Sequence, residues 1–269
     1  MIKTPLVILA GGQALRMGKC AIGVAKCSLP IYNTSLLLRQ IRQATGAGYR
    51  RIIVSTNKIF YPNLKKQLED FKFVHVFSNI NHKCGSLAAL LRVIEKTKSH
   101  RMIMSLADIF FLKNPFDVVS KYLNKKEIFL FVAKAFDKRE LGRGGIVWSN
   151  SKKKVIRIFE PAIPQNPSGF RWSGLVIFDT APKKNLRIFL KKNYLAPEEN
   201  FFSYLLTSEE SIKIDFVSDF LNVNTPQQLL LASLYQAAED ADADPLLQKT
   251  LLSAAINLRK SLLREIRNS

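Results

Sequence analysis

Residues 6–18 read Leu-Val-Ile-Leu-Ala-Gly-Gly-Gln-Ala-Leu-Arg-Met-Gly, a short apolar run that ends in a glycine pair. The run has the length of a buried strand, and the glycines predict a sharp turn directly after it. Consecutive backbone N–H groups in such a turn can point into one concavity and hold phosphate oxygens. The stretch therefore predicts a strand followed by an anion-binding loop, although a glycine pair after a strand also occurs as a generic tight turn.

Apolar runs and helical patterns alternate through the residues that follow. Strands are expected at residues 6–9, 51–55, 74–77 and 102–105, and helices at 36–44, 63–70 and 86–96. This alternation predicts right-handed βαβ units and a mostly parallel sheet. Because ligands of such sheets bind beyond the carboxyl ends of the strands, the residues after Leu9, Ser55, Phe77 and Ser105 should line one crevice.

The pattern changes at residue 128. Further strands are expected at 129–133, 145–148, 155–159, 175–178 and 213–216, and they should extend the sheet in mixed or antiparallel fashion. Two helices, 226–240 and 245–267, come last, and Asp242-Ala243-Asp244-Pro245 gives the second one a cap and a proline at its first position. We therefore predict an α/β fold: a mixed, mostly parallel twisted sheet flanked by helices, with a C-terminal helical extension.

The last predicted helix carries an apolar stripe. Its members are Leu247, Leu251, Leu252, Ala255, Leu258, Leu262 and Ile266. Such a stripe must be buried against the body of the protein or against a second subunit, so a homodimer is one of the two expectations.

Composition and charge limit the classes of function. The 269 residues are 47% hydrophobic, which is enough for a large core, and the formal net charge is +20. Basic pairs are spread along the chain instead of forming one arm, which is typical of a solvated surface and compatible with phosphate-rich substrates. A nucleic-acid partner would rest on charge alone, and we expect none.

Neither a membrane segment nor a zinc site is expected. The apolar run at residues 6–10 is too short for a signal peptide or a membrane span, so we expect a cytoplasmic protein without a membrane partner. Cys20, Cys27 and Cys84 lack CxxC spacing and are interpreted as free thiols. The three histidines are also scattered, which argues against zinc.

Three charged residues accompany the predicted loop and crevice. Arg16 follows the glycine pair, where its guanidinium can bind phosphate oxygens, and Lys26 stands ten residues later. Asp108 follows the strand at 102–105, which places a carboxylate at the edge of the crevice, as a magnesium ligand requires. An exposed lysine and an ordinary turn aspartate are the alternative interpretations of the last two.

These motifs resemble the opening signature of the sugar-1-phosphate nucleotidylyltransferases. The matching residues are Leu9-Ala10-Gly11-Gly12, Arg16, and Lys26 in Lys-Cys-Ser-Leu-Pro-Ile. The resemblance implies that the glycine loop and Arg16 bind a nucleoside triphosphate and that Lys26 contacts the phosphates at the reaction centre. Gly85 and Ser86 resemble the segment by which this family contacts the base, while an N-cap serine explains Ser86 equally well.

The same resemblance implies a magnesium site and an acceptor site. Asp108 matches a metal ligand of the family, and Asn222 or Asn224 in Leu-Asn-Val-Asn-Thr-Pro stands where relatives supply the second Mg²⁺ contact. Gly145, Glu160 and Gly174 match points of the family's sugar-binding half. Two departures fall in that half. Pro161 replaces a lysine that holds the sugar's phosphate, and Trp172 replaces a frequent asparagine or packs in the core.

The implied activity is transfer of a nucleoside monophosphate from a triphosphate to a sugar 1-phosphate or similar acceptor, with release of pyrophosphate. We expect a catalytic domain at residues 1–225, with a nucleotide-binding half (1–127) and an acceptor-binding half (128–225), and a helical segment at 226–269. Three alternatives remain open at this point: a molybdopterin guanylyltransferase-like enzyme, a catalytically degenerate nucleotide-binding regulator, and a nucleic-acid binder.

Overall fold

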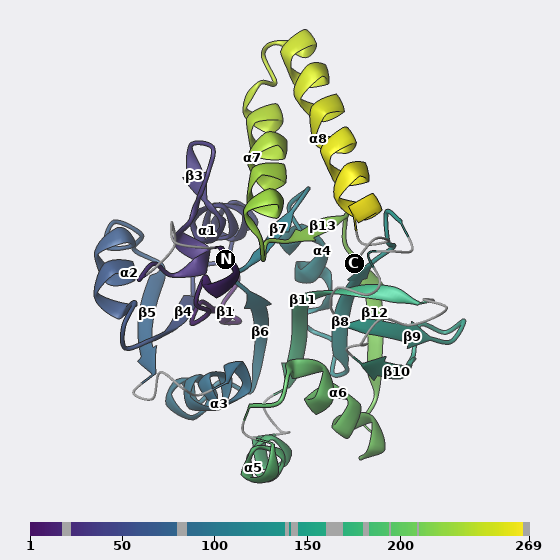
Figure 1. Cartoon of the computed structure of the whole chain (residues 1–269). Helices are drawn as coiled ribbons and strands as arrows, with labels where there is room; N and C mark the ends of the chain where they lie inside the picture. The colour runs from purple at the N-terminus through teal and green to yellow at the C-terminus, as the bar shows by residue number, and fades with distance from the viewer. Residues whose placement is uncertain are drawn as a thin grey trace.

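A nine-stranded mixed sheet with helices on both faces forms the centre of the molecule (Figure 1). The computed structural model describes residues 1–17, 23–79, 85–137, 140, 145–159, 169–179, 183–193, 195–208 and 210–265. The parallel strands are β1 (Leu6–Leu9), β4 (Ile52–Asn57), β5 (Val74–Asn79) and β6 (Arg101–Leu106), in the order β6-β1-β4-β5. The chain runs outward from β1 to β5 and returns to β6 on the other side of β1. The strand order therefore reverses beside the glycine loop, where ligands bind in such sheets.

The second half of the chain extends the sheet beyond β6, as predicted. These strands are β8 (Ile128–Ala133), β9 (Ile146–Ser149), β10 (Val155–Phe159), β11 (Phe170–Asp179) and β12 (Ile212–Phe216). β11 pairs antiparallel with β6, β8 and β9, and β12 lies parallel to β8. β11 is longer than predicted because Arg171 and Gly174 interrupt its apolar pattern, and its register shifts between Trp172 and Leu175.

Alternating side chains of the strands fill two cores, one on each face of the sheet. Leu6 and Ile8 pack on the side of α1 (Leu36–Gly46), α2 (Tyr61–Gln67) and α4 (Phe116–Val119), which is followed by a short 3₁₀ turn (Ser120–Tyr122). Val7 and Leu9 pack on the side of α3 (Ser86–Thr97), α5 (Lys183–Lys192) and α6 (Glu198–Thr207). Because successive side chains of β1 point to opposite faces of the sheet, helices pack on both faces and the fold has three layers.

A helical hairpin projects from the body as an arm (Figure 1). It consists of α7 (Pro226–Asp240) and α8 (Pro245–Glu265), and Asp244 caps α8 by accepting hydrogen bonds from the N–H groups of Leu246 and Leu247, as predicted. The apolar stripe of α8 is only partly covered: Ala255 is buried, whereas Leu247 remains 47% exposed and Leu252 37% exposed. Ile266 lies outside the described residues.

Two small two-stranded sheets connect the hairpin to the body. One pairs β2 (Pro30–Ile31) with β3 (Thr34–Ser35), and the other pairs β7 (Ile109–Phe111) with β13 (Phe220–Asn222). A third apolar cluster, which includes Phe110, Leu221 and Leu231, fills the space between these sheets and the hairpin. Within the described ranges, no helix combines the length and apolar character needed to cross a bilayer.

Candidate active site

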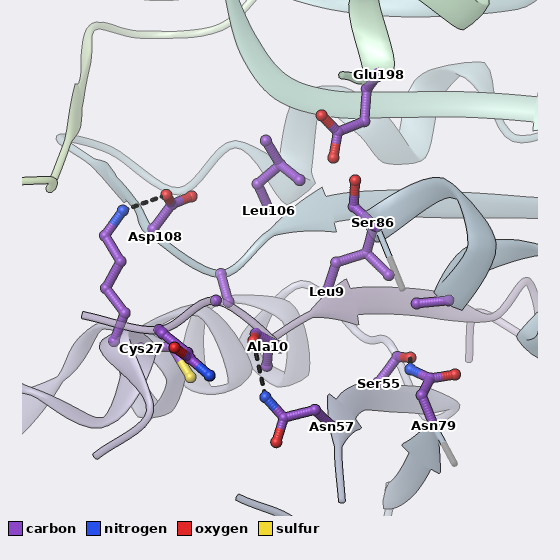
Figure 2. Close-up of a pocket in the computed structure, with 17 residues that line it drawn as sticks. Leu9, Ala10, Cys27, Ser55, Asn57, Asn79, Ser86, Leu106, Asp108 and Glu198 are labelled. Atoms are coloured by element: carbon purple, nitrogen blue, oxygen red, sulfur yellow. Dashed lines mark hydrogen bonds and ion pairs between the residues drawn. The ribbon is translucent and has the colours of Figure 1, made fainter. Parts of the chain in front are cut away.

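The crevice predicted at the ends of the parallel strands is present as a cavity of about 360 Å³ (Figure 2). It is lined by Leu9, Ala10, Gly11, Gly12, Gln13, Lys26, Cys27, Ser55, Asn57, Asn79, Gly85, Ser86, Ala89, Leu106, Ala107, Asp108 and Glu198. Every parallel strand contributes to this list at its carboxyl end. The predicted nucleotide-binding residues therefore lie together around one site, which we call the first cavity.

Backbone and side-chain groups of the neighbouring strand β4 hold the glycine loop in place. The N–H of Ala10 donates to the carbonyl of Ser55 at 2.7 Å, and the hydroxyl of Thr56 donates to the carbonyl of Ala10 at 3.1 Å. The Nδ2 of Asn57 donates to the carbonyl of Gly11 at 3.0 Å. The two side-chain contacts use the loop's carbonyl oxygens, and all three fix the path of its backbone, which pre-organises the loop for an anion.

Asn79 lies with Ser55 at the end of the first cavity opposite Asp108 (Figure 2). Its Nδ2 donates to the Ser55 hydroxyl at 2.9 Å and to the Thr56 carbonyl at 3.1 Å, so both amide protons are used. Asn79 as a whole is 3% exposed. The fixed amide presents its Oδ1 as an acceptor, and sequence reasoning missed this residue because an asparagine at a strand end is an ordinary turn residue.

Lys26 and Asp108 form the charged end of the first cavity. The Lys26 ammonium lies 2.6 Å from Oδ2 of Asp108 and also donates to Oδ1 of Asn224. Lys26 is only 8% exposed, in the short 3₁₀ helix Lys26–Ser28, and its own N–H donates to the Gly12 carbonyl at 3.2 Å. The interpretation of Lys26 as an ordinary exposed lysine is therefore wrong.

Pairing of β7 with β13 places Asn224 beside Asp108. Asn222 is in register with Ile109, and the N–H of Val223 donates to the Asp108 carbonyl at 2.9 Å. The backbone N–H of Asn224 donates to Oε1 of Gln228 at 2.7 Å, and the same Gln228 side chain forms the capping box with Thr225 that starts α7. The structure thus brings all three predicted metal-ligating residues to one edge of the sheet.

A second cavity of about 420 Å³ adjoins the first and shares Leu106, Asp108 and Glu198 with it. Gly145, Gly174, Asn222 and Asn224 line it, and these include two of the three predicted acceptor residues. Glu160 lies outside the described residues. Arg16, which was predicted among the phosphate contacts of the glycine loop, lines the second cavity and not the first.

The two glycines of the second cavity lie against other side chains. Gly174 has a φ of +70°, and a Cβ on it would come within 2.9 Å of the Leu106 side chain. A Cβ on Gly145 would come within 2.6 Å of the Glu199 side chain. Trp172 lines this cavity and also packs edge to face on Phe202, so it belongs to the core as well as to the wall of the cavity. Larger residues at the glycines would narrow the cavity.

Two acidic residues of the second cavity were not predicted. Glu198 and Glu199 open α6, a helix that the sequence analysis did not include. The start of this helix could have been recognised from Pro197, which is followed by two acidic residues and then by apolar residues at the spacing of one helix face, a common pattern at helix N-termini. Ser86 likewise differs from expectation, because Gly85 is the N-cap of α3 and Ser86 is its first residue.

The donor atoms around Lys26 are of the kind that bind magnesium. Asp108 provides a carboxylate oxygen and Asn224 an amide oxygen, and both already converge on a cation, the Lys26 ammonium. No cluster of three or more His, Cys, Asp or Glu side chains suited to a metal occurs among the residues that the structure describes. Mg²⁺ often binds through one or two carboxylates together with substrate phosphates, so this small donor set fits it.

Cys27 lines the first cavity but is chemically protected. Burial raises the pKa of its thiol to about 12, and the nearby Asp108 carboxylate acts in the same direction. The thiolate is the reactive form, so we expect iodoacetamide at pH 8 to modify Cys27 in the native protein far more slowly than in the denatured protein. Mass spectrometry of the Cys27 peptide measures both rates, and equal rates would contradict this assignment.

Residues 6–124 match the model of the MobA-like NTP transferase domain, and comparison with curated proteins gave no match. UDP-glucose pyrophosphorylase complexed with UDP-glucose has a TM-score of 0.74 at 14% identity, covering 89% of this chain and 100% of that chain. The inositol-1-phosphate CTP transferase from T. maritima has a TM-score of 0.72 at 15% identity, covering 85% and 95%.

A third similar structure is HddC from Yersinia pseudotuberculosis complexed with GMP-PN, with a TM-score of 0.67, 17% identity, and coverage of 86% of this chain and 98% of that chain. At these identities the likeness establishes the fold. The match of residues 6–124 identifies a MobA-like NTP transferase domain in this part of the chain, and it is this match that places the protein among the nucleotidyltransferases.

Proposed function

We propose that the protein transfers a nucleoside monophosphate from a triphosphate to a phosphorylated small molecule, preferentially a sugar 1-phosphate, and releases pyrophosphate. One observation carries the proposal: two cavities of comparable size meet at Asp108, and Lys26 contacts this carboxylate. The first cavity, with the glycine loop, would hold the triphosphate. The second, with Gly145 and Gly174, would hold the acceptor, so that the two substrates meet beside Lys26.

The reaction is an in-line displacement. A phosphate oxygen of the acceptor forms a bond to the α-phosphorus of the triphosphate, the bond from that phosphorus to the bridging oxygen breaks, and pyrophosphate leaves with the electron pair. The attacking oxygen is already ionised, so no general base is required. Catalysis then rests on positioning and on neutralisation of charge.

Charge repulsion between the two substrates is the main barrier that the site must reduce. Two like charges about 4 Å apart repel by about 1 kcal/mol in water and by about 4 kcal/mol at the effective dielectric of a protein surface. Lys26 from the first cavity and Arg16 from the second supply positive charge on both sides of the meeting point. Asp108 with Asn222 or Asn224 would hold Mg²⁺, which supplies further neutralisation of the phosphates when bound.

A thermal-shift screen of ATP, GTP, CTP, UTP and dTTP with Mg²⁺ tests the first half of the proposal. A ligand at about 100 times its Kd stabilises the native state by about 2.7 kcal/mol, which we expect to raise the Tm by about 5–10 °C for the cognate nucleotide. Asp108→Ala is the control for the metal. An equal shift in this variant would contradict the metal assignment, and no shift with any nucleotide would contradict the proposal.

A molybdopterin guanylyltransferase-like activity is a second candidate, because the family model that matches residues 6–124 is MobA-like. The segment Asn222 to Thr225 at the metal-binding edge is compatible with either activity. The two candidates differ in the acceptor. A stabilising shift confined to GTP, without turnover of any sugar 1-phosphate, favours this candidate over the first.

A further inference from the structure

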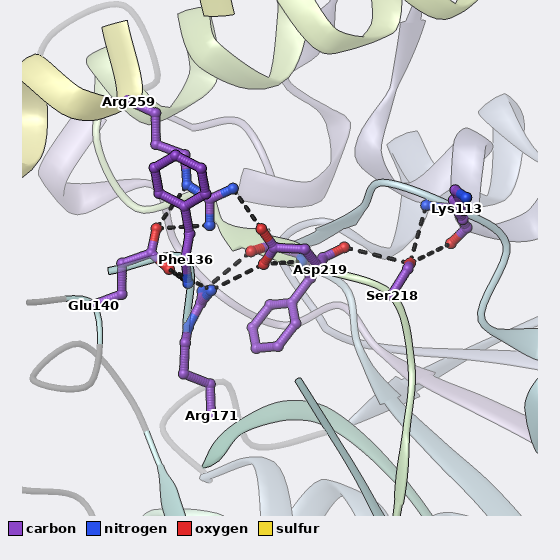
Figure 3. A network of polar contacts seen from close by, with 8 residues as sticks. Lys113, Phe136, Glu140, Arg171, Ser218, Asp219 and Arg259 are labelled. Carbon is purple, nitrogen blue, oxygen red and sulfur yellow. Dashed lines mark hydrogen bonds and ion pairs between the residues drawn. The ribbon is translucent and has the colours of Figure 1, made fainter. Parts of the chain in front are cut away.

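Four charged side chains outside both cavities form a buried network that joins the helical hairpin to the body (Figure 3). They are Glu140, Arg171, Asp219 and Arg259, of which Arg259 belongs to α8 and Arg171 to β11. Their side chains are 8%, 9%, 26% and 3% exposed. Two positive and two negative charges balance within the network, so its burial does not leave a net charge.

Arg259 bridges the two acids of the network. Its Nε donates to Oε1 of Glu140 at 2.7 Å, and its Nη1 donates to Oδ2 of Asp219 at 2.5 Å. The guanidinium also lies over the ring of Phe136, 4.5 Å from its centroid. A single side chain of the hairpin therefore contacts two separate segments of the body.

Asp219 links Arg259 to the start of β13. Its Oδ1 accepts from the N–H of Phe220 at 2.8 Å and from Nη1 of Arg171 at 3.2 Å. Arg171 also donates to the Phe220 carbonyl at 3.1 Å and to Oε2 of Glu140 at 2.8 Å. The start of β13 is thus held on its backbone as well as through the Asp219 side chain.

Two members of the network lie next to residues that line the second cavity. Arg171 immediately precedes Trp172 in β11, and Asp219 lies three residues before Asn222 and five before Asn224. None of the four network residues lines the first cavity. The network therefore lies behind the acceptor side of the site and away from the glycine loop.

We propose that Arg259 is a positioning residue for the acceptor side of the site: through Asp219 it fixes β13 and thereby Asn222 and Asn224. This inference rests on the function proposed above. It assigns the hairpin a role in catalysis, because α8 supplies the Arg259 guanidinium that holds the edge of the second cavity in position. A displacement of about 1 Å at reacting groups can cost two orders of magnitude in rate, so a small loosening of β13 has a measurable effect.

Arg259→Met tests the proposal, with Lys260→Met as the matched control. Lys260 is the next residue of α8 and is exposed, so its substitution removes the same charge from the helix without touching the network. In Arg259→Met we expect the KM for the acceptor to rise about tenfold, with the Kd for the triphosphate measured in the absence of Mg²⁺ unchanged. In Arg259→Lys the acceptor KM should lie between those of the wild type and Arg259→Met, since lysine keeps the positive charge but lacks the planar set of N–H donors of the guanidinium.

Amide hydrogen exchange provides a readout that does not depend on activity. Peptides that cover residues 219–225 should exchange severalfold faster in Arg259→Met than in Lys260→Met, while peptides from β1 and β4 should be unaffected. Loss of Arg259 leaves Glu140 and Asp219 with one cation between them, which can prevent folding. The double variant Glu140→Gln with Arg259→Met restores the charge balance, and it should fold and retain the raised acceptor KM.

The outcomes separate this inference from the proposed function. A folded Arg259→Met protein with wild-type acceptor KM, or with the acceptor KM and the Mg²⁺-free triphosphate Kd raised by the same factor, would overturn the positioning role. Unchanged exchange at 219–225 would overturn it as well. Wild-type protein that turns over no acceptor would instead refute the proposed function, and the exchange experiment would still decide the role of Arg259.

Discussion

Asp108→Asn should reduce pyrophosphate release about 10³-fold while leaving the fold intact. Asparagine keeps the shape of the side chain but removes the negative charge that holds Lys26 at 2.6 Å and that would hold Mg²⁺. Loss of one charge-stabilising group at a reaction centre costs about 10²–10³ in rate, and loss of the metal adds to this. Steady-state assay of pyrophosphate with saturating substrates measures the effect.

The matched control for this substitution is Asp117→Asn. Asp117 is exposed on α4, away from both cavities, so its substitution removes the same charge without reaching the site. The control should retain wild-type activity, and circular dichroism should show the same melting behaviour for both variants. Retention of more than about a tenth of the activity in Asp108→Asn would remove this carboxylate from the mechanism.

Lys26→Met is expected to have the second largest effect, a fall of about 10²–10³ in kcat/KM. The ammonium of Lys26 contacts Asp108, the carboxylate that both cavities share, and without it Asp108 and the phosphates of both substrates repel one another. Methionine keeps the length and apolar stem of the side chain. Initial-rate kinetics with each substrate varied in turn measures the loss.

Lys58→Met is the control for Lys26→Met, because Lys58 is exposed just beyond the end of β4 and loses the same charge. The control should behave as wild type. Equal losses in the two variants would mean that general attraction of anions by a chain of net charge +20, and not a specific contact, explains the effect of Lys26.

The parallel half of the fold and the first cavity could be predicted from sequence because their signals are local. Leu6 to Gly12 is both a strand and its turn within seven residues, and the alternation of strands and helices fixes which ends share an edge. Asp108 could be located by the same argument, since it follows β6 directly. The ion pair between Lys26 and Asp108 could not, because those residues are 82 positions apart.

The features that could not be predicted are those whose sequences show no clear periodic pattern or whose partners lie far apart in the chain. β7 and β13 have three residues each, too few to show a pattern, yet their pairing brings Asn224 to Lys26. The helix α6, with Glu198 and Glu199, is partly hidden because aromatic residues also favour strands. Arg259 and Glu140 are 119 residues apart, and each alone is an ordinary surface charge in the sequence.

The apolar stripe of α8 predicted only part of how the hairpin packs. The pattern in α8 correctly predicted a buried face around Ala255, but it could not distinguish body from second subunit at Leu247 and Leu252. The homodimer therefore stays a prediction. In the isolated chain a charged residue, Arg259, is buried in the hairpin to the same degree as Leu231 and Leu263 and anchors it through ion pairs.

Phosphorus NMR of a reaction mixture tests the central claim most directly. Wild-type protein with Mg²⁺, the nucleoside triphosphate that gives the largest thermal shift, and a panel of sugar 1-phosphates should produce a nucleoside diphosphate sugar and pyrophosphate in equal amounts. The same mixture with Asp108→Asn should show only starting materials. Pyrophosphate accompanied by free nucleoside monophosphate, or no reaction with any acceptor, would contradict transfer of a nucleotide to a phosphorylated acceptor.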